Sequence, residues 1–180
     1  MKKVILLTFP LESLSYQAFS AIKNMHVQRE IKGEQMAVIT HRQDGTHQFD
    51  IKDFIDFTGK NHTAKNSMIG MLVGLFAGPL AMMLGWFTGS MIGGAQDAKE
   101  VATAKTIFEF VGEQIEEGQT GLILIAAEAD NRPLNQLVFQ ELGGQITRLD
   151  LPTVMTEVED AQQLEKEIKS QQPETKPTEE

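Results

Sequence analysis

The stretch that decides the architecture is NSMIGMLVGLFAGPLAMMLGWFTGSMIGGAQ, residues 66–96. It has no charged side chain and lies between Lys65 and Asp97. These 31 uncharged residues separate two parts of opposite charge in a chain of 180 residues. Residues 1–65 carry nine basic and seven acidic groups (+2), and residues 97–180 carry seven basic and eighteen acidic groups (−11). The segment is therefore predicted to lie in an apolar environment, unlike the charged, water-soluble parts on either side.

Small residues recur at every fourth position of this segment, in two series that flank Gly78 and Pro79. Glycine in a helix costs about 0.8–1 kcal/mol relative to alanine, so close helix packing must offset that cost. Small side chains at this spacing let two helix backbones approach closely. We therefore expect a helical hairpin that turns at Gly78-Pro79 and self-associates through its small residues. The predicted helix-packing positions are Gly70, Gly74, Gly78, Ala81, Gly85, Gly89 and Gly93.

The length of the segment limits how it can meet a membrane. A single helix of this length would reach about 46 Å and could cross the ~30 Å hydrocarbon core once. A hairpin would have arms of roughly 18 and 25 Å, which are too short to cross twice. Three arrangements remain open, namely a re-entrant hairpin, a single span and a hairpin buried in a soluble oligomer. We favour the re-entrant hairpin.

Lysines flank the uncharged segment on both sides. Lys60 and Lys65 precede it, and Lys99 and Lys105 follow it. We expect these four ammonium groups to meet anionic headgroups on one leaflet. Trp86 is the residue we expect at the membrane interface, where tryptophan is enriched.

The N-terminal part predicts a strand, a helix and a hairpin. Val4–Phe9 is apolar on both faces, as in a central strand. A helix follows, and then EQMAVITHRQ and THQFDIKDF flank Asp44-Gly45, a strong two-residue turn signal. That turn pairs Thr40 with Phe49 and predicts His41 and His47 on opposite faces, unable to share a metal. A shared face is predicted for Met36, Val38, Phe49 and Ile51.

The C-terminal part predicts a long amphipathic helix over 97–117, an apolar strand in TGLILIAAEAD, a helix after Asn131 and a strand in QITRLDL. Two strands alone are too few for a stable sheet, so the two halves are expected to share one. The predicted fold class is α+β, a ferredoxin-like sandwich with helices on one face of a mostly antiparallel sheet. Residues 1–152 form the single predicted domain, interrupted by the 66–96 hairpin.

Residues 153–180 are rich in acidic groups and end in QQPETKPTEE, which has too little apolar surface to fold alone. This stretch is predicted to be a solvated acidic tail, helical over about 157–169 and then disordered.

No pattern of catalytic chemistry is present. The chain has no cysteine, no phosphate-binding glycine loop ending in a lysine, and neither HExxH nor GxSxG. The net charge of −9 repels a polyanion, which excludes nucleic acid as an expected partner. We predict no catalytic residue, cofactor, metal or small-molecule substrate.

The order of these elements resembles a known bacterial family over about residues 1–152. The resemblance is carried by KKVILLTF, the Asp-Gly hairpin, GMLVGLFAGPLAMMLGWFTGSMIGG and TGLILIAAEAD with its following helix. The family is called domain of unknown function 1269. The resemblance implies a predicted membrane protein, of a kind sometimes named a general stress protein, and no known activity.

These observations favour a non-enzymatic protein bound to the cytoplasmic membrane, with membrane lipid and further copies of itself as partners. The main domain is expected on the cytoplasmic side. The alternative is a cytoplasmic, soluble oligomeric binding module whose hairpin is buried in the oligomer.

Overall fold

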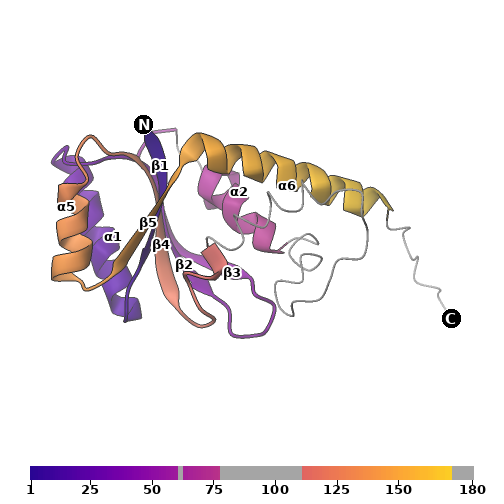
Figure 1. Cartoon of the computed structure of the whole chain (residues 1–180), viewed down its shortest axis with the longest axis horizontal. Coiled ribbons are helices and arrows are strands. Elements are labelled where there is room, and N and C mark those ends of the chain that lie inside the picture. The colour runs from indigo at the N-terminus through magenta and orange to yellow at the C-terminus, as the bar shows by residue number, and fades with distance from the viewer. Residues whose placement is uncertain (61–62, 78–110, 172–180) are drawn as a thin grey trace.

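One antiparallel sheet organises the fold (Figure 1). The computed structural model describes residues 1–60, 63–77 and 111–171. Within them, five strands follow the order β3-β2-β4-β1-β5, and every neighbouring pair is antiparallel. The α+β prediction with a shared antiparallel sheet is therefore confirmed. The strands are β1 (Lys2–Thr8), β2 (Lys32–His41), β3 (Phe49–Asp56), β4 (Thr120–Ala127) and β5 (Gln145–Asp150).

The position of β4 joins the two parts of the chain. β4 lies between β2 and β1, although the uncharged segment separates it from both in sequence. Hydrogen bonding across these strands requires both halves to be on the same side of any membrane. The single-span arrangement, which puts the halves on opposite sides, is therefore incompatible with this sheet.

Helices cover both faces of the sheet, so the prediction of helices on one face was wrong (Figure 1). One face is covered by α1 (Glu12–Val27) and by α5 (Arg132–Asn135), which continues as η3 (Gln136–Glu141). The other face carries η1 (Ala64–Asn66), α2 (Met68–Gly74), η2 (Leu75–Ala77) and α6 (Leu151–Gln171). The physical reason is that β1 and β4 are apolar on both sides, and each side needs a cover.

The helix α6 corrects the prediction of a solvated tail. It begins at Leu151 rather than near residue 157, so the boundary predicted at residue 152 lies within it. Its apolar residues recur at helical spacing and are buried against the sheet and α2. The acidic composition of the segment concealed this apolar stripe. Its buried residues are Leu151, Val154, Val158 and Ala161. Disorder was predicted after about residue 169, but α6 continues to Gln171, and residues 172–180 lie outside the described residues.

The β2–β3 register is shifted by one residue from the predicted one. His41 pairs with Phe49, and Thr40 pairs with Asp50. The cause is the turn, where Gly45 and His47 both have positive φ and five residues, 43–47, separate the paired Arg42 and Gln48. A one-residue shift reverses which face a side chain occupies.

A bulge between Val38 and Ile39 changes the alignment again farther along the two strands. The predicted shared face is therefore split between the two cores. Met36 and Val38 lie in the core under α1, whereas Phe49 and Ile51 pack in the core under α6.

Shortening one buried side chain of α6 tests its packing. Val158→Ala removes two methyl groups from a residue that is 1% exposed. We expect a loss of about 2 kcal/mol in the free energy of unfolding, from lost burial plus a residual cavity. Glu159→Ala, at an exposed position on the same helix, should change it by less than about 0.5 kcal/mol. Urea unfolding followed by circular dichroism measures both, and equal stability of the two variants would contradict a packed α6.

Candidate functional site

The first residues of the uncharged segment are fixed to the sheet. Ser67 caps α2, because its Oγ accepts a hydrogen bond from the Gly70 amide at 2.9 Å and donates one to the Ala64 carbonyl at 2.7 Å. The buried side chain of Gln35 on β2 accepts a hydrogen bond from the Ile69 amide at 3.3 Å. The start of α2 is thereby held against β2.

The apolar side of α2 and η2 is part of the protein core. Five large residues of residues 68–77 are buried between the sheet and α6. Phe76 packs edge-on against Phe49, with ring centroids 4.9 Å apart. Within the described ranges, no helix is both long enough and apolar enough to cross a membrane. The five buried residues are Ile69, Leu72, Val73, Leu75 and Phe76.

Two of the predicted helix-packing positions, Gly70 and Gly74, are among the described residues, and their surroundings differ. A Cβ atom built on Gly70 would lie 1.9 Å from the Ala64 carbonyl oxygen, so this glycine permits a close approach of α2 to η1 within one chain. Gly74 is exposed, and a Cβ built there meets no described atom within 4 Å. Of these two described glycines, only Gly74 thus remains available for a contact with another helix.

The other predicted positions divide in the same way. Lys60, which precedes η1, and Lys65, which lies within it, are both exposed, as a contact with headgroups requires. The remaining positions lie outside the described residues. These are Gly78, Pro79, Ala81, Gly85, Trp86, Gly89, Gly93, Lys99 and Lys105.

Alanine at the two glycines should have opposite effects. Gly70→Ala places a methyl group on a backbone carbonyl, and we expect it to cost about 2–3 kcal/mol of unfolding free energy. Gly74→Ala meets no described atom and should raise the free energy by roughly 0.5 kcal/mol through better helix propensity. Urea titration of both variants in the same buffer gives the comparison. Similar stabilities would show that Gly70 is not needed for the contact with η1.

A second candidate site lies at the β2–β3 turn. The ligand-type atoms of His41, His47 and Glu117 all lie within 4.8 Å of one another. The two imidazole rings have centroids 5.6 Å apart, so the prediction that they point to opposite faces and cannot share a metal was wrong. The one-residue change in register, caused by His47 at φ 53°, brings them together.

Three separate pieces of backbone position these side chains. His41 ends β2, is 3% exposed and stacks on Phe49 with ring centroids 4.4 Å apart. Its Nδ1 lies 2.7 Å from the carbonyl oxygen of Ile115. Glu117 precedes Gly118, whose amide donates to the His41 carbonyl at 2.9 Å and whose φ is +80°. The backbone of His41 is therefore linked directly to the turn that carries Glu117.

The electrostatics of the turn favour a neutral His47 beside an acidic neighbour. Its Nδ1 lies 2.8 Å from Glu117 Oε1. Burial lowers the pKa of His47, and the negative charge of Glu117 partly opposes that shift. Hydrogen bonds from Thr46 lower the pKa of Asp44 in the same loop. The turn therefore combines imidazole nitrogens with carboxylate groups.

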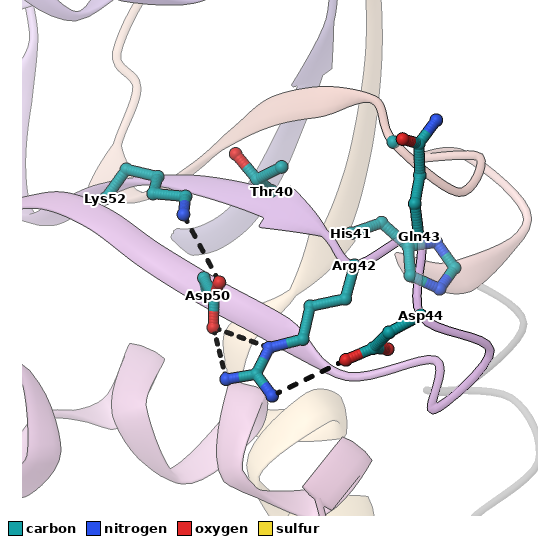
Figure 2. A pocket seen from close by; sticks show the side chains of 8 residues that line it. Thr40, His41, Arg42, Gln43, Asp44, Asp50 and Lys52 are labelled. Atoms are coloured by element: carbon teal, nitrogen blue, oxygen red, sulfur yellow. Dashed lines mark hydrogen bonds and ion pairs between the residues drawn. The ribbon is translucent and has the colours of Figure 1, made fainter.

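A shallow depression adjoins this cluster, and Figure 2 shows its side chains. Arg42 forms hydrogen-bonded ion pairs with Asp50, and Lys52 Nζ lies 3.2 Å from the same carboxylate. The hydrogen bond from Arg42 is the main cause that lowers the pKa of Asp50. Because these charges pair with one another, the depression presents no concentrated charge of one sign.

A polar group of side chains at another edge of the sheet is structural. The Arg148 guanidinium binds both carboxylate oxygens of Glu128, at 2.7 and 3.0 Å, and donates to Asn135 Oδ1 at 2.8 Å. These contacts tie β5 to the end of β4 and to α5. The guanidinium and carboxylate are engaged with each other, so we assign them no chemical role.

Sequence reasoning missed the His41–His47–Glu117 cluster because it depends on a turn conformation and on a non-local strand pairing. The one available signal was Glu117 directly before Gly118, a glycine predicted to end the helix over 97–117. In the structure the helical residues end at 112, and Glu117 lies in a turn. Comparisons with protein-family models, curated proteins and solved structures found no significant match.

Proposed function

We propose that this chain is a non-enzymatic protein of the cytoplasmic membrane that attaches to lipid through residues 78–96 and self-associates through Gly74 and the predicted small residues that follow it, with its α+β body in the cytoplasm. One observation carries the proposal. Ala77 directly follows the buried Phe76, Val111 is buried in the same core cluster, and residues 78–96 between them have no charged side chain. Both ends of the intervening chain thus belong to one face of one sheet.

The lengths involved favour insertion into one leaflet. Because the arm predicted before Gly78-Pro79 is packed in the protein core, a hairpin in lipid has to turn within residues 78–96 and not at Gly78-Pro79. As a single helix these 19 residues would extend about 28 Å, and such a hairpin would reach about half that depth. A chain that returns to the same face of the body needs the hairpin arrangement. Its apolar residues, such as Leu84 and Phe87, then lie in lipid at a depth that does not require complete crossing.

The charges around the segment support the same orientation. Lys60 and Lys65 are exposed and precede α2 in sequence. Each lysine near an anionic surface contributes about 1 kcal/mol of attraction. Lys99 and Lys105 follow the segment in sequence and add to this attraction.

The strand order supports a ferredoxin-like assignment for the body. The four strands β5-β1-β4-β2 and the helices α1 and α5 reproduce a split β-α-β arrangement, with β3 added at the edge of β2. The resemblance to domain of unknown function 1269 is in line with this fold and with a membrane-associated, stress-related role.

A second function is favoured by the burial of α2. The first part of the uncharged segment packs into the body of its own chain. If residues 78–96 were likewise buried against protein, in this case against other copies of the chain, the result would be a soluble oligomeric binding module. The two proposals differ in what covers the segment, which is lipid in the first and protein in the second.

Vesicle flotation separates these functions. The full chain should float with vesicles of phosphatidylethanolamine and phosphatidylglycerol, whereas Leu84→Glu with Phe87→Glu should remain at the bottom because charged groups in hydrocarbon are costly. The matched control, Leu11→Glu with Phe139→Glu, changes two exposed apolar residues of the body and should float like the unmodified chain. Circular dichroism checks that all three are folded. An unmodified chain that stays at the bottom as a discrete, detergent-independent oligomer would reject lipid attachment and support the second function.

Self-association through the glycine positions has its own test. Gly74→Leu with Gly89→Leu should weaken association in mild detergent, because two leucines hold helix backbones apart. Gly74 is the suitable described position, since it is exposed and a Cβ atom built there meets no described atom within 4 Å. Sedimentation velocity measures the oligomer, with Met71→Leu as a control of conserved volume on the exposed side of α2. An unchanged oligomer in the double-leucine variant would remove the role of the glycine stripe.

A further inference from the structure

We propose that His41, His47 and Glu117 form a binding site for a divalent transition-metal ion, with Zn²⁺ as the expected occupant. The three ligand-type atoms lie within 4.8 Å of one another. Two imidazoles and one carboxylate are a common set of protein ligands for zinc, completed by a water molecule at the fourth position. This inference is independent of membrane attachment.

The hydrogen bond of His41 orients it as a ligand. With Nδ1 at 2.7 Å from the Ile115 carbonyl oxygen, the ring donates its Nδ1 hydrogen to that carbonyl. The other nitrogen, Nε2, then carries the lone pair that a metal requires. Metal-binding histidines commonly donate their second ring nitrogen to a backbone carbonyl or carboxylate in this way. Stacking on Phe49 further restrains the ring.

His47 and Glu117 supply the more exposed side of the site. Their side chains are 24% and 39% exposed, so a hydrated ion has access from solvent. In a tetrahedral zinc site the ligand atoms are about 3.3 Å apart, given metal–ligand bonds near 2.0–2.1 Å. The 2.8 Å separation of His47 Nδ1 and Glu117 Oε1 has to widen slightly, and the longest separation in the cluster has to shorten by about 1.5 Å. The half-buried His47 and the exposed Glu117 are the side chains that would have to move.

The type of donors selects the class of metal. Imidazole nitrogen favours zinc, copper, nickel and cobalt over calcium and magnesium, which prefer an all-oxygen shell. One carboxylate and two neutral imidazoles also leave a single positive charge on a bound divalent ion. The ionised Asp44 carboxylate of the same loop helps to balance that charge, since it acts electrostatically on His47.

A metal here would link the two halves of the chain. His41 and His47 come from the β2–β3 hairpin, and Glu117 comes from the segment that re-enters the body before β4. Binding to the folded state alone raises apparent stability by mass action. The expected effect is therefore a saturable rise in thermal midpoint as Zn²⁺ is added.

The test uses the full chain without a histidine tag, stripped of metal and then dialysed against Zn²⁺ or Co²⁺. The unmodified chain should retain one Zn²⁺ and give the visible absorption of four-coordinate Co²⁺. Loss of a residue that only hydrogen-bonds to a metal ligand typically weakens metal binding by about 10–100-fold. His47→Asn and Glu117→Gln each remove a proposed ligand, so each should weaken Zn²⁺ binding at least that much. Asparagine is chosen because it tolerates the positive φ of position 47.

Glu116→Gln is the matched control, since it removes the neighbouring carboxylate, which lies outside the cluster. It should bind metal like the unmodified chain. A second measurement does not depend on any variant, because paramagnetic Co²⁺ should shift and broaden the nuclear magnetic resonance signals around residues 41, 47 and 117 first. Absence of retained metal in the unmodified chain would overturn the proposal. Equal binding by all variants, or Co²⁺ effects centred elsewhere, would overturn it as well.

Discussion

The pairing of β4 with β2 on one side and β1 on the other is the interaction on which the rest of the structure depends. The interior of β4 is completely buried, and its neighbours come from a part of the sequence that ends more than 70 residues earlier. Without it the N-terminal strands have no common sheet, since β1 and β2 do not touch each other. The formation of this sheet therefore determines where the uncharged segment leaves the body and where the chain after it rejoins the body.

The sheet has a hydrophobic core on each face, and only one of these two cores adjoins the candidate sites described above. The core under α1 and α5 is built from ordinary amphipathic helices and carries no candidate site. The core under α2 and α6 holds the start of the uncharged segment, and both candidate sites adjoin it. Phe49 is the link between them, because it packs on His41 on one side and on Phe76 on the other.

The sequence predicted the elements well where one local signal dominated. The continuous apolar runs of β1 and β4 and the helix with Ala18 and Ile22 on its inner face are examples, because burial and periodicity agree there. The α6 helix was assigned to the tail since its many acidic residues lowered the average hydropathy, although Val154 and Val158 are spaced for burial. Composition is an average, and a single apolar stripe is enough to fix a helix to a sheet.

The turn was predicted incorrectly for a different reason. Asp44-Gly45 is a strong two-residue signal, but the positive φ of His47 lengthens the turn by backbone geometry that residue preferences do not reveal. The approach of Glu117 depends in addition on β4 lying next to β2, which is a contact between distant parts of the chain. The location of the candidate metal site therefore follows from tertiary structure, whereas its donor residues are visible in the sequence.

The late position of β4 also has a consequence for biosynthesis. At translation rates of about 5–20 residues per second, roughly 4–16 seconds pass between the appearance of β2 and that of β4. During this interval β1 and the β2–β3 hairpin cannot pair with β4, because β4 has not yet been synthesised. The uncharged residues 66–96 emerge from the ribosome in the same period. Nascent chains in that condition are prone to aggregate, so chaperones that shield exposed strands would act on this protein chiefly before residue 127 has left the exit tunnel.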